Sequence, residues 1–289
     1  TFFRSRVDAT QSMQSRFAAK QLVFAHAALT DVEGKRLWHD QRIAREGFDV
    51  ATAASGDMRL KLRDWSLARD SSGAMTARVA ASTFSFDLGF RTTQPDLLQG
   101  DQGLSRKGPL PEQASYYYSE PQLQVAGALV FQGKRVDVTG RAWLDHEWSE
   151  ALLHPEAMGW DWIGMNLDDG SALMAFRLRK PDGTALWDGG AFRARGHDVY
   201  IFSPGEVQFG AQRRWTSPLT RANYPVEWIV RTPADFYRVS AVLDNQELDS
   251  RTSTGAIYWE GLSRLFDSNG RKVGSGYLEM TGYAQRLRL

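Results

Sequence analysis

Ionisable side chains alternate with indoles in residues 140–170, GRAWLDHEWSEALLHPEAMGWDWIGMNLDDG, which hold four of the ten tryptophans of the chain. Residues two apart on a β-strand share a face. One face of such a strand would carry His146 and Trp148, and the other Trp143, Asp145 and Glu147. Because a buried carboxylate or imidazole needs a partner or a shifted pKa, the pattern favours a pocket where an apolar ligand meets an acid or base. The alternative is that the tryptophans are core and the charges face water or one another.

The second half of this stretch repeats the arrangement, with Trp160 and Trp162 on one face and Asp161 on the other. An acid or imidazole in apolar surroundings has its pKa moved towards the working range of a general acid or base. Indole faces stabilise a developing cation. Together these features suit proton-initiated chemistry on an alkene. The candidate catalytic residues are His146, Glu147 and Asp161.

The C-terminal motif YWEGLSRLFDSNGRKVGSGYLEMTGYAQRL mixes aromatic and acidic residues in the same way. In a terminal hairpin Tyr277 and Glu279 share a face. Glu260 and Glu279 are each flanked by apolar residues on strands that we expect to be central, although most of the motif also fits a barrel-closing strand pair. The candidate substrate-binding residues are Trp143, Trp148, Trp160, Trp162, Trp259, Glu260, Tyr277 and Glu279.

Motifs for metal and cofactor chemistry are weak or missing. His146, Glu150 and His154 are spaced by four, so a helix would place these zinc-type ligands on one face. The run is HEWSE and not H-E-x-x-H, however, and the stretch up to Trp148 favours a strand. No G-x-S-x-G elbow, Walker loop or G-x-G-x-x-G follows a strand. We therefore expect neither a metal nor a cofactor.

Composition bounds the remaining classes. The 289 residues carry 35 basic and 34 acidic side chains, well mixed, which gives no nucleic-acid footprint and no polybasic membrane patch. Cysteine is absent, which excludes disulfides and thiolate chemistry and fits a cytosolic or a periplasmic location equally. No apolar run approaches the roughly 18–20 residues of a membrane-spanning helix. The chain opens TFFRSRV without an initiator Met, so a signal peptide or lipid anchor could precede it.

Period-2 segments separated by turn residues run through both halves of the chain, as in MRLKLRDWSLAR–DSSG–AMTARVAASTFSFDLGF. No helix-length stripe alternates with them, which predicts an all-β fold with meander or barrel closure. Residues 93–115 have no period and are expected to form a long loop. A brief helical pattern in residues 150–158 ends at Pro155 and marks the predicted boundary between domains at 1–155 and 156–289.

Four ordered blocks, GRAWLDHEW, GWDWIGMNLDDGSALMAFRLR, YWEG and GSGYLEMTGY, resemble the signature blocks of the AttH-like family. This family includes the hydroxyneurosporene synthases, which are carotenoid hydratases, and predicted secreted hydrolases. The resemblance covers essentially the whole chain and implies two lipocalin-like β-barrel or β-sandwich domains, packed side by side, with a ligand cavity in or between them. The opening TFFR resembles the end of the family's first block, whose Glu-Trp-Trp-Tyr portion would lie upstream, so the first N-terminal strands are expected to be truncated.

By motif match, His146 and Trp148 fall on the His-x-Trp pair of the hydratases, and Asp161 falls near their acidic position. Glu147 stands where the hydratases have an amide, which is a departure from the pattern. The resemblance implies a protein that binds a polyene, isoprenoid or lipid, with cofactor-independent hydration, cyclisation or isomerisation as the candidate activity. The alternative is a non-catalytic carrier or accessory protein that works with an ABC transporter or at the membrane surface. The resemblance and the lack of cysteine lead us to expect a periplasmic or otherwise extracytoplasmic location, with no nucleic-acid partner.

Overall fold

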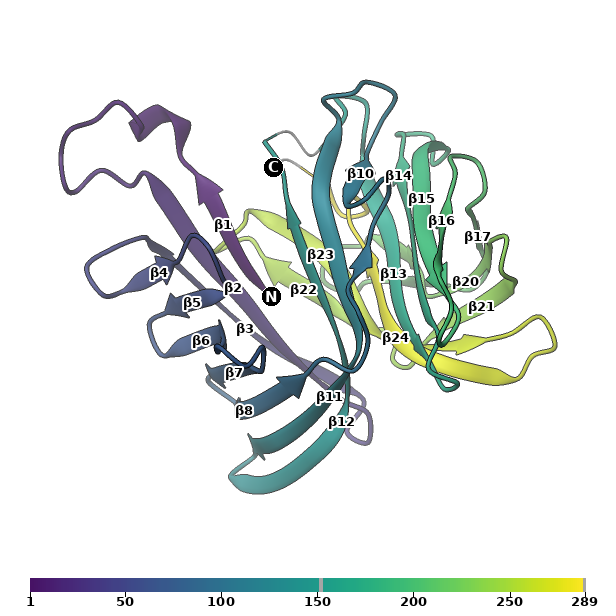
Figure 1. Ribbon diagram of the computed structural model, residues 1–289, viewed down its shortest axis with the longest axis horizontal. Helices are drawn as coiled ribbons and strands as arrows, with labels where there is room; N and C mark the ends of the chain where they lie inside the picture. Colours follow the sequence, from purple (N-terminus) through teal and green to yellow (C-terminus); the bar gives the residue numbers. More distant parts are fainter. Residues whose placement is uncertain (151–152, 288–289) are drawn as a thin grey trace.

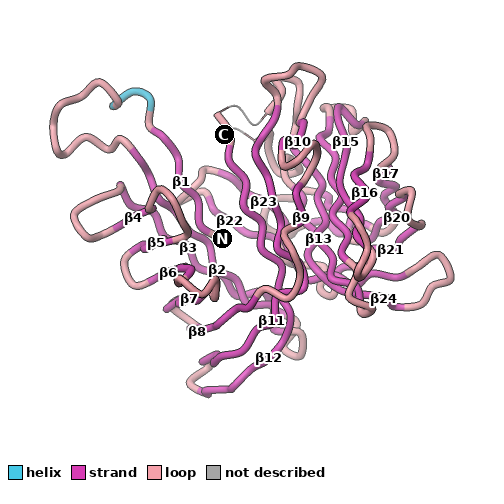
Figure 2. Tube along the Cα trace, in the orientation of Figure 1, coloured by secondary structure: helices cyan, strands magenta, loops and turns pink. Residues whose placement is uncertain are grey.

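The computed structural model describes residues 1–150 and 153–287, and it consists almost entirely of antiparallel β-strands (Figures 1 and 2). Its helical content within those ranges is one 3₁₀ turn, η1 (Asp8–Thr10). No helix in this part of the chain is long and apolar enough to cross a membrane. The all-β, lipocalin-like fold expected from the sequence is confirmed. It forms because alternating apolar residues and frequent turns favour hairpins over helices.

The N-terminal half builds two sheets. An antiparallel three-stranded sheet contains β1 (Phe2–Arg6), β2 (Gln21–Asp31) and β3 (Arg36–Arg45). The second sheet contains β4 (Ala51–Ala53), β5 (Arg59–Leu62), β6 (Trp65–Arg69), β7 (Met75–Ala80), β8 (Phe84–Arg91), β9 (Leu97–Leu98), β10 (Leu104–Arg106), β11 (Ala114–Phe131) and β12 (Lys134–Trp148). Its main path runs β10-β11-β8-β7-β6-β5-β4, and β9 and β12 also pair with β11.

The two N-terminal sheets curl around one apolar core and form a half-barrel (Figure 1). Val23 and Ala25 on β2 pack with Leu62 and Trp65, and all four are fully buried. The indole N–H of Trp65 donates to the Ala80 carbonyl at 2.9 Å, so its polar atom is satisfied inside the core. Burying these side chains removes apolar surface from water, at about 25 cal/mol per Å², and holds the small sheet against the large one.

The C-terminal half is built around a ten-stranded sheet. Its strands are β13 (Gly159–Leu167), β14 (Ala172–Arg179), β15 (Ala185–Arg193), β16 (Val199–Phe202), β17 (Gln208–Ala211), β20 (Glu227–Arg231), β21 (Phe236–Ala241), β22 (Glu247–Ser250), β23 (Ala256–Phe266) and β24 (Lys272–Met280). The order is β16-β15-β14-β13-β24-β23-β21-β20-β17, with β22 paired to β23. Strands β18 (Arg214–Thr216) and β19 (Asn223–Pro225) form a separate pair.

The C-terminal sheet curls around its own core, which includes Trp228 and Trp259. The central strand β14 is covered on both faces, which explains its unbroken apolar run ALMAF. Leu173 points into the C-terminal core, whereas Met174 and Phe176 point the other way, towards the N-terminal half. The outer face of this sheet is therefore a packing surface for a second set of strands.

The two halves meet through side chains, because no strand pair in the described ranges joins β1–β12 to β13–β24. The long β11–β12 hairpin pairs with β8 near its turn, and its other end lies against β13 and β14 (Figure 1). The predicted domain boundary at 155 falls between β12 and β13. Part of the predicted helix, residues 151–152, lies outside the described residues, and the described remainder of 150–158 contains no helix.

The prediction of a structureless loop at 93–115 was wrong in two respects. The segment contributes the short strands β9 and β10, which pair with β11. It also buries Leu97, Gln99 and Lys107. Short strands of two or three residues carry too little periodicity to be seen in a sequence.

Candidate functional site at the junction of the two halves

Three tryptophans of the signature motifs gather where β12 meets β13. The rings of Trp143 and Trp162 lie 6.5 Å apart, edge to face, and the Trp162 indole N–H donates to the Tyr117 hydroxyl at 3.1 Å. Trp160 is on the same face of β13 as Trp162. A Cβ added to Gly164 would lie 2.3 Å from the Trp162 ring and 3.1 Å from the Trp143 ring, so glycine leaves the space that the indoles occupy.

Asp145 is the polar centre of this aromatic wall. Its Oδ1 accepts hydrogen bonds from the Ser119 hydroxyl at 2.6 Å and from the Trp143 indole N–H at 2.8 Å. Burial raises the pKa of Asp145 to about 6, although these hydrogen bonds act in the opposite direction. The Asp145 residue nevertheless keeps surface that water can reach. A carboxyl with that pKa, accessible and fixed by its donors, can exchange a proton near neutral pH.

Glu147, next along the same face of β12, is neutralised by a buried cation. The Lys107 ammonium forms an ion pair with Glu147 at 2.9 Å, and the Ser115 hydroxyl also donates to this carboxylate. The ammonium lies over the rings of Tyr117 and Phe176, at 4.8 and 4.4 Å from their centroids. Lys107 and Ser115 thus hold the Glu147 side chain in place beside the aromatic rings.

Glu260 and Glu279 are directly opposite each other on β23 and β24, and Trp162 on β13 is opposite Glu279 on its other side. Burial raises the pKa of Glu279 well above its usual value, and the charges of Glu260, Asp145 and Glu147 raise it further. Burial also raises the pKa of Glu260. Within residues 1–150 and 153–287, no lysine or arginine side chain pairs with either carboxyl. The Thr1 ammonium lowers the pKa of Glu260 in part, so a charged Glu260 beside Glu279 favours the protonated form of Glu279.

Tyr277 completes this face of β24, two residues before Glu279. It is 39% exposed, yet the pKa of its hydroxyl is raised to about 12 by burial. The Tyr277 side chain is therefore partly covered by protein and partly accessible to solvent. We call the set Trp143, Asp145, Glu147, Trp160, Trp162, Glu260, Tyr277 and Glu279 the junction site.

His146 and Trp148 are placed elsewhere. The strand period puts them on the opposite face of β12 from Trp143, in contact with Tyr116 and Tyr118. The His146 Nδ1 lies 3.1 Å from the Tyr118 hydroxyl, and Trp148 stacks on Tyr116 and is 49% exposed. The structure therefore does not place His146 and Trp148 beside Trp160 and Trp162. A single pocket lined by all four residues would require that arrangement.

Asp161 is also separated from the junction site, on the inner face of β13. It is fully buried, and its carboxylate pairs with Arg177 at 2.8 Å and Arg179 at 3.0 Å. The Tyr283 hydroxyl donates to the same carboxylate at 2.9 Å. A carboxylate held by two guanidinium groups is a structural anion, so the interpretation of Asp161 as the proton donor is corrected.

Trp259 is corrected in the same way. It is fully buried in the C-terminal core, and its indole N–H donates to the Asp244 carbonyl at 2.7 Å. Its neighbour Glu260 points to the other face of β23. The predicted substrate contact of Trp259 is thus a core contact, whereas Trp143, Trp160, Trp162, Glu260, Tyr277 and Glu279 share the junction site.

The structure adds three residues that the sequence interpretation did not select as site residues: Lys107, Tyr117 and Asp145. Asp145 had a signal, since it shares a strand face with Trp143 in the GRAWLDHEW block. For Tyr117 the sequence showed only its place in an alternating strand. For Lys107 there was no indication in the sequence, because a lysine in an aperiodic segment is usually solvated.

No group of three or more histidine, aspartate or glutamate side chains is placed to hold a metal ion in the described part of the chain. His146 lies on a strand, and the Nδ1 of His154 accepts the Glu156 backbone N–H at 3.0 Å. The helix that would align them with Glu150 includes residues 151–152, which lie outside the described residues.

Comparisons with known proteins agree with the fold and the motifs. A crystal structure described as an AttH protein from Nitrosomonas europaea is 46% identical, with a TM-score of 0.90 over 98% of this chain and 85% of that one. Kievitone hydratase from Nectria haematococca shares the fold at 16% identity, with a TM-score of 0.73 over 91% of this chain and 81% of that one.

A third solved structure, CghA with Sch210972, is 12% identical, with a TM-score of 0.55 over 92% of this chain and 81% of that one. The search of curated proteins found no significant match. Residues 1–283 match the AttH-like family. The chain is therefore a member of the AttH-like family.

Proposed function

We propose that this protein binds an apolar, unsaturated small molecule at the junction site and transfers a proton to it without a cofactor. Hydration of an alkene is the simplest outcome, and isomerisation or ring closure are variants of the same first step. The single observation that carries the proposal is the pair Glu260 and Glu279. These two carboxyls have raised pKa values and lie opposite each other beside the tryptophan side chains. The fold shared with kievitone hydratase supports the reaction class.

Glu279 is the proton donor in this proposal. A carboxylic acid that stays protonated near neutral pH can protonate an alkene carbon, which ordinary solvated glutamate cannot do at that pH. The O–H bond of Glu279 breaks, a C–H bond forms, and the alkene becomes a carbocation. Glu260 acts as the neighbouring charge that favours the protonated state of Glu279.

The indoles of Trp143, Trp160 and Trp162 stabilise the cation. An indole face within about 6 Å of a cation contributes about 0.5–2 kcal/mol when water is displaced. Edge-to-face packing and the hydrogen bond to Tyr117 fix the Trp162 ring, so this stabilisation needs no reorganisation.

Asp145 is the base that closes the cycle. Water adds to the cation through a lone pair and becomes an oxonium group, and Asp145 accepts the surplus proton, consistent with a pKa of about 6. The alkene has then gained one water molecule. The proton returns from Asp145 to Glu279 through solvent at the accessible side of the site.

The competing function is a carrier, in which the same indoles hold a lipid or isoprenoid that leaves unchanged. The ion pair between Lys107 and Glu147 favours the carrier function, because it leaves this part of the site without net charge and so suits an apolar ligand. We further propose an extracytoplasmic location, which rests on the family of the chain and is compatible with the absence of cysteine. Fractionation of cells that express the full-length protein tests this, and a uniformly cytosolic pool contradicts it.

Saturable quenching of tryptophan fluorescence by acyclic polyenes such as neurosporene or lycopene tests the binding step. Trp162→Phe should weaken the affinity and Trp215→Phe, on the separate β18–β19 pair, should not. Mass analysis of the recovered ligand then separates the two functions. A ligand that has gained water, or has isomerised, supports the enzyme, and an unchanged ligand supports the carrier. No saturable binding by any isoprenoid or lipid tested would refute both.

A further inference from the structure

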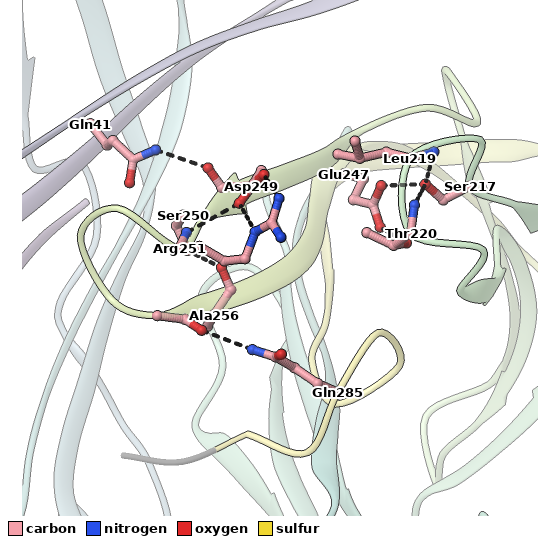
Figure 3. A network of polar contacts seen from close by, with 11 residues as sticks. Gln41, Ser217, Leu219, Thr220, Glu247, Asp249, Ser250, Arg251, Ala256 and Gln285 are labelled. Atoms are coloured by element: carbon pink, nitrogen blue, oxygen red, sulfur yellow. Dashed lines mark hydrogen bonds and ion pairs between the residues drawn. The ribbon is translucent and has the colours of Figure 1, made fainter.

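A chain of hydrogen bonds runs from the N-terminal sheet to the outer face of β23. Gln41 on β3 donates from Nε2 to the Asp249 carbonyl at 2.8 Å (Figure 3). The Ser253 hydroxyl donates to Gln41 Oε1. His26 on β2 continues the chain, with Nε2 at 2.8 Å from the Ser253 hydroxyl and Nδ1 at 2.7 Å from the Tyr258 hydroxyl. These bonds tie the three-stranded sheet to the C-terminal half.

The donor and the acceptor of every hydrogen bond in this chain follow from the end at the Asp249 carbonyl. A backbone carbonyl only accepts, so Asp249 fixes the amide of Gln41 with its nitrogen towards Asp249 and its oxygen towards Ser253. That oxygen also only accepts, so the single hydroxyl proton of Ser253 points to it. The other acceptor near Ser253, the Ser250 carbonyl at 3.2 Å, would take the same proton.

Ser253 must therefore accept from His26, which places the imidazole proton on Nε2. Burial lowers the pKa of His26 to about 4, so the ring is neutral near neutral pH and Nδ1 is bare. A bare ring nitrogen accepts, and the proton of the Tyr258 hydroxyl must point to it. The orientation of the phenol is thus set directly by His26, which is 232 positions away in the sequence.

Tyr258 belongs to the same face of β23 as Glu260, two residues on, and faces away from the core that contains Trp259. The pKa of its hydroxyl is raised well above the usual value, by burial first and then by the charges of Glu260 and Glu279. The hydroxyl therefore stays protonated. No other donor within the described residues bonds to its oxygen, which keeps a lone pair for a further partner.

We propose that Tyr258 is an obligate hydrogen-bond acceptor of the junction site, that it orients a water molecule or a ligand hydroxyl there, and that His26 is the residue that positions it. The inference rests on the proposed function for the nature of the ligand, and on the hydrogen-bond chain and the neutral state of His26 for the direction of the bond to Tyr258. A water molecule attacks a cation through a lone pair, so its O–H groups must point to acceptors. Tyr258 takes one of them and the base takes the proton of the other, and no bond to Tyr258 is broken.

The direction of the hydrogen bond between Tyr258 and His26 can be tested directly by ¹⁵N NMR of the histidine side chains of the wild-type protein. The five histidines are distinguished by comparison with His26→Asn. We expect His26 as the Nε2–H tautomer with an unprotonated Nδ1 that accepts a hydrogen bond, and we expect the signature of that bond to disappear in Tyr258→Phe. The Nδ1–H tautomer would reverse the phenol and overturn the proposal.

The recognition of a hydroxyl is tested with two probes of one skeleton, the alcohol farnesol and the hydrocarbon farnesene. Tyr258→Phe should lower the affinity for farnesol about three- to tenfold, as for the loss of one hydrogen bond, and should change farnesene less than twofold. His26→Asn keeps an acceptor oxygen and should retain more of the farnesol preference than His26→Leu. Tyr224→Phe, which removes a buried hydroxyl from Glu247 in the C-terminal core, is the matched control and should alter neither affinity.

The outcomes separate the two proposals. Equal losses for both probes in Tyr258→Phe, or a farnesol preference that Tyr258→Phe leaves intact, would contradict hydroxyl recognition by Tyr258. If neither probe binds the wild type, the proposed function fails for isoprenoids, and hydroxyl recognition by Tyr258 fails with it, whereas the NMR result still confirms or overturns the direction of the bond between Tyr258 and His26.

Discussion

Replacement of Asp161 by Asn should destabilise the C-terminal half strongly, because Asp161 balances two buried cations. Its side chain is fully buried, and those of Arg177 and Arg179 are 14% and 6% exposed. An amide cannot neutralise two guanidinium groups, and it donates where the arginines also donate. Removal of one partner from a buried ion pair costs about 3–5 kcal/mol, since the remaining charge is left uncompensated.

That loss converts into a large change in melting temperature. Residues 159–287 make up about 130 residues, and an unfolding entropy of about 2.1 cal/mol/K per residue gives about 0.27 kcal/mol/K for this half. If it unfolds independently, Asp161→Asn lowers Tm by about 11–18 °C. If the whole chain unfolds as one unit, the decrease is about 5–8 °C.

Differential scanning calorimetry at pH 7 measures the change, and Glu279→Gln is the matched control. Each substitution replaces one acid by its amide, on adjacent strands of the same sheet and on opposite faces. Glu279 has no cationic side-chain partner in the described residues, so its amide should change stability by less than about 1 kcal/mol. Equal losses in the two variants, or an unchanged Tm in Asp161→Asn, would refute the assignment of Asp161 as a structural anion.

Three further results are expected. The folded pKa of Asp145, about 6, exceeds its unfolded value of about 4, so the folded state holds more protons between these values and the wild type should lose stability relative to Asp145→Asn as pH rises from 4 to 6 in urea titrations. Gly164→Ala places a methyl group against Trp162, so it should cost about 1–3 kcal/mol and shift the tryptophan emission, and an unchanged spectrum would contradict the packing. Lys107→Met leaves Glu147 without its cation and should cost about 1–3 kcal/mol in the same titrations, whereas a neutral effect would show that the ion pair is dispensable.

The alternation of side chains along single strands could be predicted from the sequence. Trp160 and Trp162 do lie on the face of β13 opposite Asp161, and Tyr277 and Glu279 do share a face of β24. The all-β fold follows from the same pattern, because period 2 and frequent turns leave no room for helices.

The choice of which face meets which neighbour could not be predicted in this way. One face of β12 carries His146 and the other carries Trp143 and Asp145, and only the packing of two sheets decides that Trp143 meets β13. The partners of Asp161 come from the next strand, so a proton donor and a structural anion look alike in the sequence. His26 and Tyr258 are 232 positions apart, and no local pattern connects them.

The fate of a bound polyene in Glu279→Gln tests the central claim most directly. Wild-type protein and variant are incubated with the same acyclic polyene in ¹⁸O-labelled water, and the mass of the product is measured by mass spectrometry. The account predicts a product labelled with ¹⁸O from the wild type. In Glu279→Gln it predicts binding within about tenfold, or 1.4 kcal/mol, and product formation lower by about 10²–10⁴, as for a lost general acid. Undiminished labelled product from Glu279→Gln, or recovery of only unchanged polyene from the wild type, would contradict it.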